Sequence, residues 1–188
     1  MKARLQKSIV LFGGAFDPPH LGHRQVTEFL AGHPSFDEVW LVPVADHPFS
    51  KTLEGFFHRS TMVALNIQGL KNVFVCEIEN TLSKPSYTIQ TVLKLKEQYP
   101  HYRFTLAMGS DCKDQLKKWK NIEQLFQEVS FHFIPRAGFE NSPFCDISST
   151  QLRDMLFARE EDYTKYLVPS VASYIEENGL YQELPYAA

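Results

Sequence analysis

The chain of 188 residues has few cysteines, no long apolar run and no excess of positive charge. Its three cysteines are scattered, so they match neither the paired ligands of a zinc site nor a small disulfide scaffold. No stretch approaches the roughly 18 apolar residues needed to cross a bilayer. The polar start of the chain, residues 1–7, lacks the features of a secretory signal. We therefore expect a cytoplasmic protein with reduced thiols and no membrane anchor.

The net charge of the chain restricts which molecules it is expected to bind. The formal net charge is −3 at pH 7, which gives no broad attraction to nucleic acid or to anionic membranes. A basic stripe with interleaved aromatic residues, which is typical of nucleic-acid binding, is also missing. We expect small-molecule ligands and no nucleic-acid partner, and the oligomeric state is left open.

Hydrophobic residues make up 44% of the chain, enough for a sizeable core, and no internal repeat indicates a second domain. Short β-rich runs alternate with segments of helical periodicity, which predicts an α/β fold: an open parallel sheet with helices on both faces. The chain is expected to form one domain, residues 1–188, with a helical part from about 149 onward. The predicted strands are 9–12, 39–42, 73–78, 104–108 and 129–134. The predicted helices are roughly 21–31, 57–67, 88–98, 122–128, 149–158 and 169–177.

Ligands of open α/β sheets bind beyond the carboxyl ends of the strands, where loops lead into helices. The unusual residues of this chain fall in such places. They occupy four segments, the last of which follows a short extended piece at 144–146: 13–23, 45–51, 109–119 and 147–153. We expect these four segments to converge on one cleft.

The first segment reads Gly-Gly-Ala-Phe-Asp-Pro-Pro-His-Leu-Gly-His and joins an apolar strand to a helix. Gly13 and Gly14 are predicted to allow positive φ angles and a close approach of the backbone to a ligand. His20 and His23 are three residues apart and share one helix face. Imidazole donors at a helix N-terminus are suited to phosphate oxygens and to charge that develops during phosphoryl or nucleotidyl transfer. The alternative is a tight turn followed by two histidines that merely cap a surface helix.

The second segment reads Ile-Ser-Ser-Thr-Gln-Leu-Arg, from Ile147 to Arg153, and begins another helix. Hydroxyls and backbone amides at such a helix end can hold the outer phosphates of a nucleoside triphosphate, with Arg153 as a fixed cation. Ser148 or Ser149 is the expected N-cap, and ordinary capping is the alternative interpretation of the whole segment.

These two segments, in this order and this far apart, resemble the two signatures of the HxGH nucleotidyltransferase superfamily, whose fold is Rossmann-like. Within it the chain is most similar to the bacterial nicotinate-nucleotide adenylyltransferases. The similarity spans most of the chain and includes Pro-Ser-Tyr-Thr-Ile from Pro85, Met-Gly-Ser-Asp from Met108, Lys118-Trp119, and the tail from Val168 to Tyr181.

The resemblance implies an enzyme that joins ATP, accompanied by Mg²⁺, to nicotinate mononucleotide, giving nicotinate adenine dinucleotide and pyrophosphate in NAD biosynthesis. His20, His23 and Arg153 would be catalytic, with no protein metal ligand. Thr88, Trp119 and Lys51 would bind the acceptor, a pyridine mononucleotide. The residues implied for ATP binding are Gly13, Gly14, Ala15, Phe16, His20, His23, Gly109, Asp111, Ile147, Ser149 and Arg153.

The chain departs from the family pattern in three places. Ala15 stands where a hydroxyl residue is usual, the segment 45–51 lacks the common Asn-Pro-Pro-His-Lys sequence, and Gln90 replaces an acidic residue. These departures leave alternatives for the acceptor, such as nicotinamide mononucleotide or phosphopantetheine. A nucleotide-binding regulator without turnover is the alternative from another class.

Several single residues have structural alternatives too. Trp119 is either an acceptor contact or an aromatic residue packed over a loop. Asp111 is either a ribose ligand or a helix cap. Tyr87 is expected to fill core space, and residues 113–120 to form a solvated helix face or loop. The remaining histidines show no ligand spacing and are expected to be structural or exposed: His33, His47, His58, His101 and His132.

Overall fold

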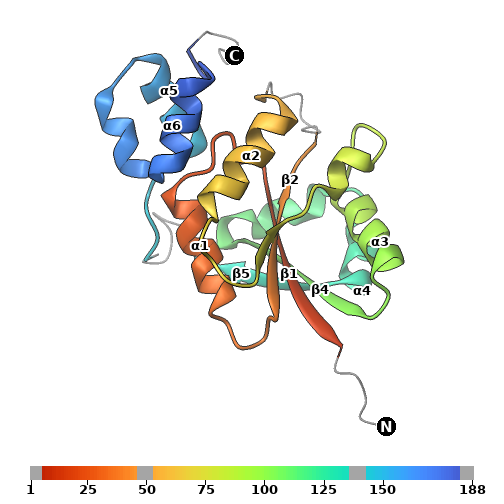
Figure 1. The fold of residues 1–188 in the computed structure, drawn as a ribbon. Coiled ribbons are helices and arrows are strands. Elements are labelled where there is room, and N and C mark those ends of the chain that lie inside the picture. Colours follow the sequence, from red (N-terminus) through yellow and green to blue (C-terminus); the bar gives the residue numbers. More distant parts are fainter. Residues whose placement is uncertain (1–5, 46–52, 136–142, 183–188) are drawn as a thin grey trace.

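The computed structural model describes residues 6–45, 53–135 and 143–182. Five parallel strands form one open sheet in the order β3-β2-β1-β4-β5 (Figure 1). The predicted open parallel sheet is therefore confirmed, and the α/β fold is Rossmann-like. The strands are β1 (Lys7–Gly14), β2 (Glu38–Pro43), β3 (Val73–Val75), β4 (Tyr102–Gly109) and β5 (Ser130–Ile134).

The six predicted helices are present, with ends shifted by at most one residue. They are α1 (Leu21–Ala31), α2 (Phe56–Asn66), α3 (Thr88–Gln98), α4 (Ile122–Glu128), α5 (Ser149–Phe157) and α6 (Pro169–Glu177). Three 3-10 helices were not predicted, because such short turns have no long hydrophobic period. These are η1 (Ile78–Thr81), η2 (Ser110–Lys118) and η3 (Glu161–Tyr166).

One strand prediction was wrong. β3 ends at Val75 instead of continuing to residue 78, because the chain turns into η1 and buries Ile78 and Glu79, each 7% exposed. The amide of Cys76 still donates to the carbonyl of Leu41, so the turn begins directly beyond it. The segment 144–146 forms no strand; its backbone instead reaches the α1 side chain Gln25, whose Oε1 accepts from the amide of Cys145 at 2.6 Å.

Alternating residues of the central strand point to opposite faces of the sheet and produce two cores. Ile9 and Leu11 of β1 pack with α3 and α4 on one face. Val10, between them, packs on the other face with Leu30 of α1 and Val63 of α2. Figure 1 shows α3 and α4 on the opposite side of the sheet from α1 and α2. The period-2 pattern of β1 therefore explains why both faces carry helices.

A third cluster attaches the C-terminal helices to α2. Met62 of α2 is fully buried against Leu152 of α5 and against Val171 and Ile175 of α6. Figure 1 shows α5 and α6, in blue, beside α2 and beyond the end of the sheet where β1 finishes. This packing brings the start of α5 to the same end of the sheet as the loop that follows β1.

Arg59 of α2 ties that loop to its neighbours. Its side chain is 1% exposed and donates to three backbone carbonyls, those of Glu54 at 2.7 Å, Ala15 at 2.7 Å and Val44 at 2.8 Å. Burial lowers the pKa of Arg59, and the charge of Asp17 opposes that change. A buried guanidinium needs such partners, since an unpaired buried charge is strongly unfavourable.

Asp17 connects the same loop to the C-terminal part of the chain. Its carboxylate is fully buried, and Oδ1 accepts from the hydroxyl of Tyr181 at 2.8 Å and from the amide of Glu54 at 3.3 Å. Burial raises the pKa of Asp17, although Tyr181, Arg153 and Arg59 all favour the charged form. The ionised carboxylate is therefore held at a net cost, despite its partners.

We expect Asp17→Asn to alter the pH dependence of stability. Because the pKa of Asp17 is raised on folding, protonation of its carboxyl stabilises the folded state, and this contribution is lost as pH rises through the folded pKa. The wild-type free energy of unfolding should therefore rise relative to that of the variant as the pH falls from neutral toward the ordinary carboxyl pKa of 3.8. Urea unfolding of both proteins across this range measures the difference. A constant difference would show that Asp17 does not titrate in this way.

Candidate active site

The candidate site lies at the carboxyl ends of β1 and β4, the two neighbouring central strands. The strand order 3-2-1-4-5 reverses direction at this pair, and such a switch point is where open α/β sheets form their ligand crevice. Gly14 ends β1 and Gly109 ends β4, so the loops that follow both strands open on this crevice.

The two histidines predicted to act together do lie together. His20 is the N-cap of α1 and is 7% exposed, and His23 is in the first turn. Their ring centroids are 3.7 Å apart with an interplanar angle of 36°, and the amide of His20 donates to Nδ1 of His23 at 3.2 Å. The two interpretations of these histidines, as helix caps and as a pair of imidazoles beside the crevice, are therefore compatible. The histidines complete the cap of α1, and their rings also contact each other.

One part of the glycine prediction was wrong. Gly13 and Gly14 are the last residues of β1 and do not adopt positive φ; Phe16 does, with φ of 50°. A side chain on Gly14 would meet the ring of Phe16 at 3.2 Å, and that ring packs edge-on against His23 at 5.0 Å between centroids. Gly14 thus makes room for the residue that supports His23, and the left-handed turn comes two positions later.

Gly22, between the histidines, is required by a close approach. A Cβ there would lie 3.0 Å from the carbonyl oxygen of Cys145 and 3.0 Å from Nδ1 of His20. Both distances are shorter than ordinary contacts, and the first involves backbone that cannot easily move. Only glycine lets the 143–147 segment and the His20 ring share this space.

The second predicted segment reaches the same place. Ser148 is the N-cap of α5 and forms a capping box with Gln151, so ordinary capping is performed here by Ser148. The next residue, Ser149, donates from Oγ to the carbonyl of Pro18 at 2.9 Å. Arg153 donates from Nη1 to the carbonyl of Asp17 at 2.6 Å. Two segments more than 130 positions apart are thereby joined at one point.

The other residues implied for ATP binding lie before α5 or where β4 ends. Ile147 is partly buried against the cluster of the C-terminal helices. Gly109 pairs with Ile134 of β5, at the end of the ladder. Asp111 is the second residue of η2, whose N-cap position is held by Gly109, so Asp111 is not the cap of that helix. Its role as a ribose ligand stays a prediction.

On the acceptor side, the structure brings two of the three predicted residues into one region. Thr88 is the first residue of α3, and Trp119 follows η2 directly. Nζ of Lys120 lies 4.2 Å from the ring centroid of Tyr87, which places the residues next to Thr88 and Trp119 in contact. Lys51 lies outside the described residues.

Both aromatic residues of this region pack on the core under α3. Trp119 and Tyr87 are partly buried against the cluster that contains Ile89 and Val92. The expectation that Tyr87 fills core space is confirmed. Trp119 has the packing role that was its alternative, and its contact with a pyridine ring stays a prediction. In η2 itself, Leu116 is buried and the lysines beside it are exposed, which confirms the solvated face.

Two of the three departures from the family pattern have a physical account. Oε1 of Gln90 accepts from the amide of Tyr87 at 2.9 Å, so this amide oxygen caps α3 as a carboxylate would. Ala15 contributes its carbonyl, which accepts from Arg59 at 2.7 Å, and its position is fixed without a side-chain hydroxyl. The third departure falls mainly on residues 46–51, outside the described part of the chain.

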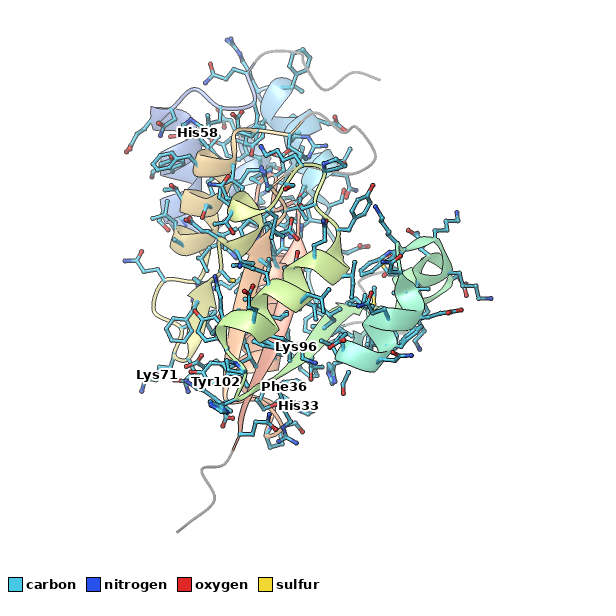
Figure 2. The ribbon with its side chains drawn as sticks, turned by 90° about the vertical axis from the view of Figure 1, so that its right-hand side faces the viewer. His33, Phe36, His58, Lys71, Lys96 and Tyr102 are labelled. Atoms are coloured by element: carbon cyan, nitrogen blue, oxygen red, sulfur yellow. The ribbon has the colours of Figure 1, made fainter. Side chains whose placement is uncertain are left out.

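The remaining histidines that the structure describes are not in the crevice. The rings of His33 and His132 are 5.0 Å apart and pack around Phe36, at the amino end of the sheet. Burial, and secondarily His33, lowers the pKa of His132. Figure 2 shows His33 and Phe36 together near the chain's N-terminus and His58 at the opposite end of the molecule. There His58 shares a hydrogen bond of 2.9 Å with the hydroxyl of Tyr174.

A cavity of about 540 Å³ is present between the starts of β1, β2 and β4 and the segment that follows β3, and neither histidine of the pair lines it. It is lined in part by Trp40, Tyr99 and Tyr102, whose rings contact one another, and by the ion pair of Lys7 and Glu38. None of the residues implied for either substrate lines it. The residues implied for ATP binding lie instead around the carboxyl ends of β1 and β4 and the start of α5.

Sequence reasoning missed three buried charged residues around the crevice: Asp17, Arg59 and Glu79. The burial of Arg59 could have been predicted from the sequence. Met62, Val63 and Asn66 follow it at helical spacing, so Arg59 lies on the buried face of α2. A charge inside an apolar stripe indicates a buried partner. Asp17 and Glu79 had no comparable signal, since their partners come from distant segments of the chain.

The described residues contain no helix long and apolar enough to cross a membrane. They also contain no group of three or more histidine, cysteine or acidic side chains able to hold a metal ion by itself. Asp17, the carboxylate nearest the histidines in sequence, is fully buried and hydrogen-bonded to Tyr181. A metal ion at this site would depend on phosphate oxygens for its ligands, which is the usual manner of Mg²⁺.

Comparison with known proteins agrees with this geometry. The sequence model of the cytidylyltransferase-like family matches residues 11–155. The nicotinate-nucleotide adenylyltransferase of Bacillus subtilis (strain 168) is 33% identical over 189 residues, which cover 94% of this chain and 99% of that protein. The probable nicotinate-nucleotide adenylyltransferase of Shouchella clausii is 36% identical, with 93% and 97% of the two chains covered.

A solved structure shows the same arrangement. The Plasmodium falciparum nicotinic acid mononucleotide adenylyltransferase, complexed with NaAD, superposes with a TM-score of 0.81 at 26% identity and covers 93% of this chain and 97% of that one. Fold and sequence therefore agree. The chain is a nucleotidyltransferase of the cytidylyltransferase-like family and belongs to its nicotinate-nucleotide adenylyltransferases.

Proposed function

We propose that this protein transfers the adenylyl group of ATP to nicotinate mononucleotide, forming nicotinate adenine dinucleotide and pyrophosphate. One observation carries the proposal beyond the family likeness. The start of α5 is joined to the loop that precedes the histidine pair of α1. Arg153 donates to the carbonyl of Asp17 at 2.6 Å, and Ser149 donates to the carbonyl of Pro18 at 2.9 Å. Two helix N-termini suited to phosphate thus face one crevice.

The ATP side would be held by the groups around this junction. His20 and His23 would donate to phosphate oxygens, and Ser149 with Arg153 would bind the outer phosphates. Gly109 and Asp111 would hold the adenosine ribose where β4 ends. The Mg²⁺ that accompanies ATP as substrate would reduce the negative charge of its phosphates.

The reaction requires no covalent enzyme intermediate. A phosphate oxygen of the mononucleotide attacks the α-phosphorus of ATP, a new P–O bond forms, and the bond to the bridging oxygen of the β-phosphate breaks in line. Pyrophosphate leaves with that oxygen. Catalysis then consists of positioning and of stabilising the charge that develops on the phosphoryl oxygens. His20 and His23, fixed in one orientation by their mutual contact, are suited to that task.

The acceptor would bind beside the start of α3. The Trp119 indole offers a face for a pyridine ring, and backbone amides near Thr88 offer donors for a carboxylate. Lys51 is retained as a proposed contact. We also place the enzyme in the cytoplasm, because three scattered cysteines fit a reducing compartment.

Pyrophosphate release with ATP and Mg²⁺ tests the proposal. We expect turnover with nicotinate mononucleotide that exceeds turnover with nicotinamide mononucleotide and with phosphopantetheine at matched concentrations. Preference for a different acceptor would reassign the substrate. Tight ATP binding without release from any acceptor would instead favour a nucleotide-binding regulator.

We expect His23→Ala to lower kcat/KM by about 100-fold to 1,000-fold, the usual effect of removing a donor that stabilises transition-state charge. The free energy of unfolding should fall by only about 1 kcal/mol, since the side chain also serves as a helix cap. His33→Ala is the matched control, because that ring packs far from the crevice. Parallel losses of stability and activity in His23→Ala would assign it a structural role.

Arg153→Ala should weaken ATP binding by about 1.5 to 3 kcal/mol, the worth of a hydrogen bond to a charged group. Titration calorimetry with ATP measures this loss directly, without turnover. Lys165→Ala on η3 is a suitable control, because its ion pair with Asp162 lies on the surface. Unchanged ATP affinity in Arg153→Ala would remove this residue from the site.

A further inference from the structure

Glu79 is a buried carboxylate that none of the proposed catalytic steps uses. It lies in η1, is 7% exposed, and accepts three hydrogen bonds from three different segments. Oε2 accepts from the amide of Ala45 at 3.1 Å and from Oγ of Ser86 at 3.1 Å. Oε1 accepts from Oγ1 of Thr91 at 2.9 Å. The carboxylate therefore connects the end of β2, the segment before α3, and α3 itself.

The peptide group that Glu79 binds at Ala45 is also bound by a second buried side chain. The amide N–H of the Val44–Ala45 peptide donates to Glu79, and the carbonyl of the same peptide accepts from Nη2 of Arg59 at 2.8 Å. Glu79 and Arg59, two buried side chains of opposite charge, thus form hydrogen bonds to the two ends of one peptide dipole. This fixes the direction in which the chain leaves β2 and enters the 45–51 segment.

The other two bonds of Glu79 hold the start of α3. Ser86 precedes Thr88 by two residues and Thr91 follows it by three. Glu79 therefore accepts hydrogen bonds from residues on both sides of Thr88. The Gln90 cap on Tyr87 fixes the same turn. One carboxylate therefore holds both Ala45, which follows β2, and the turn around Thr88, which is proposed to contact the acceptor.

The ATP side depends on different bonds. Ser149 and Arg153 are held by the carbonyls of Pro18 and Asp17, and Ala15 is held by Arg59. Among the described residues, the three hydrogen bonds of the Glu79 carboxylate go to Ala45, Ser86 and Thr91 and reach none of these ATP-side residues. Loss of the Glu79 carboxylate thus removes hydrogen bonds on the acceptor side only, although its charge also favours the charged form of Arg59.

We infer that Glu79 is the positioning residue of the acceptor subsite, and that it sets the affinity for the mononucleotide and leaves ATP affinity unchanged. This inference rests on the proposed function. It assigns Glu79 no contact with substrate; its effect passes through the Val44–Ala45 peptide and the first turn of α3.

The experiment measures KM for nicotinate mononucleotide and for ATP, together with thermal stability, in wild type and variants. Glu79→Ala leaves a buried amide and two hydroxyls without their acceptor, so the acceptor KM should rise roughly tenfold or more while the ATP KM stays within about twofold. Glu79→Gln should restore most of the acceptor affinity. Its amide oxygen can accept from Ala45, and its NH₂ group can donate to Thr91, whose hydroxyl also accepts.

Two further variants keep the test decisive if Glu79→Ala does not fold. Ser86→Ala and Thr91→Val each remove one donor and leave the carboxylate in place, and each should raise the acceptor KM in the same direction by a smaller factor. Leu95→Ala is the matched control, because this buried residue lies one turn further along α3 and its side chain has no hydrogen-bonding group. It should lower the melting temperature and leave the acceptor KM unchanged.

Equal rises of both KM values in Glu79→Ala, no rise in either, or an equal acceptor effect in Leu95→Ala would overturn the inference. Failure of the proposed function is seen separately, since wild-type enzyme would then release no pyrophosphate with nicotinate mononucleotide. An active wild type with an unaltered acceptor KM in the Glu79 variants would defeat only the role of Glu79.

Discussion

The buried guanidinium of Arg59 is the interaction on which the arrangement of the crevice depends. It donates to carbonyls in the loop after β1, in the segment after β2 and in the residue pair that leads into α2. Each of these carbonyls belongs to irregular backbone without a strand or helix partner, and buried carbonyls need donors. One planar side chain with five donors satisfies all three segments at once, which also holds them at fixed spacing.

This cation also explains how a carboxylate is tolerated in the same region. Asp17 has no exposure to solvent and carries a raised pKa caused by burial, yet Arg59, Arg153 and Tyr181 all favour its charged form. Tyr181 and Arg153 come from the C-terminal part of the chain. The same charges that hold the loop after β1 thus attach α5 and α6 to it, and the apolar cluster around Met62 adds packing to that attachment.

The crevice is in consequence divided into two halves with separate supports. The half proposed for ATP is organised by the Asp17-Pro18 backbone, and the half proposed for the acceptor by Glu79. Arg59 links the two halves, because it holds the carbonyl of Ala15 in the loop after β1 and also the Val44–Ala45 peptide, whose other end Glu79 holds. An enzyme that brings two phosphorylated substrates together in line needs both halves in register, and a shared peptide group is a direct way to maintain it.

The sequence by itself determined most of the helices and strands of this protein, and it predicted the residues of the candidate site. Hydrophobic periodicity is a local property, so the six helices and the main strands were predictable, and so was the face shared by His20 and His23. The tertiary structure decided what depends on distant partners. It placed the left-handed turn at Phe16 instead of the glycines, ended β3 early to bury Glu79, and assigned Asp17 and Arg59 their roles. A buried charge is stable only beside its partners, and those partners are brought together by folding and not by spacing along the chain.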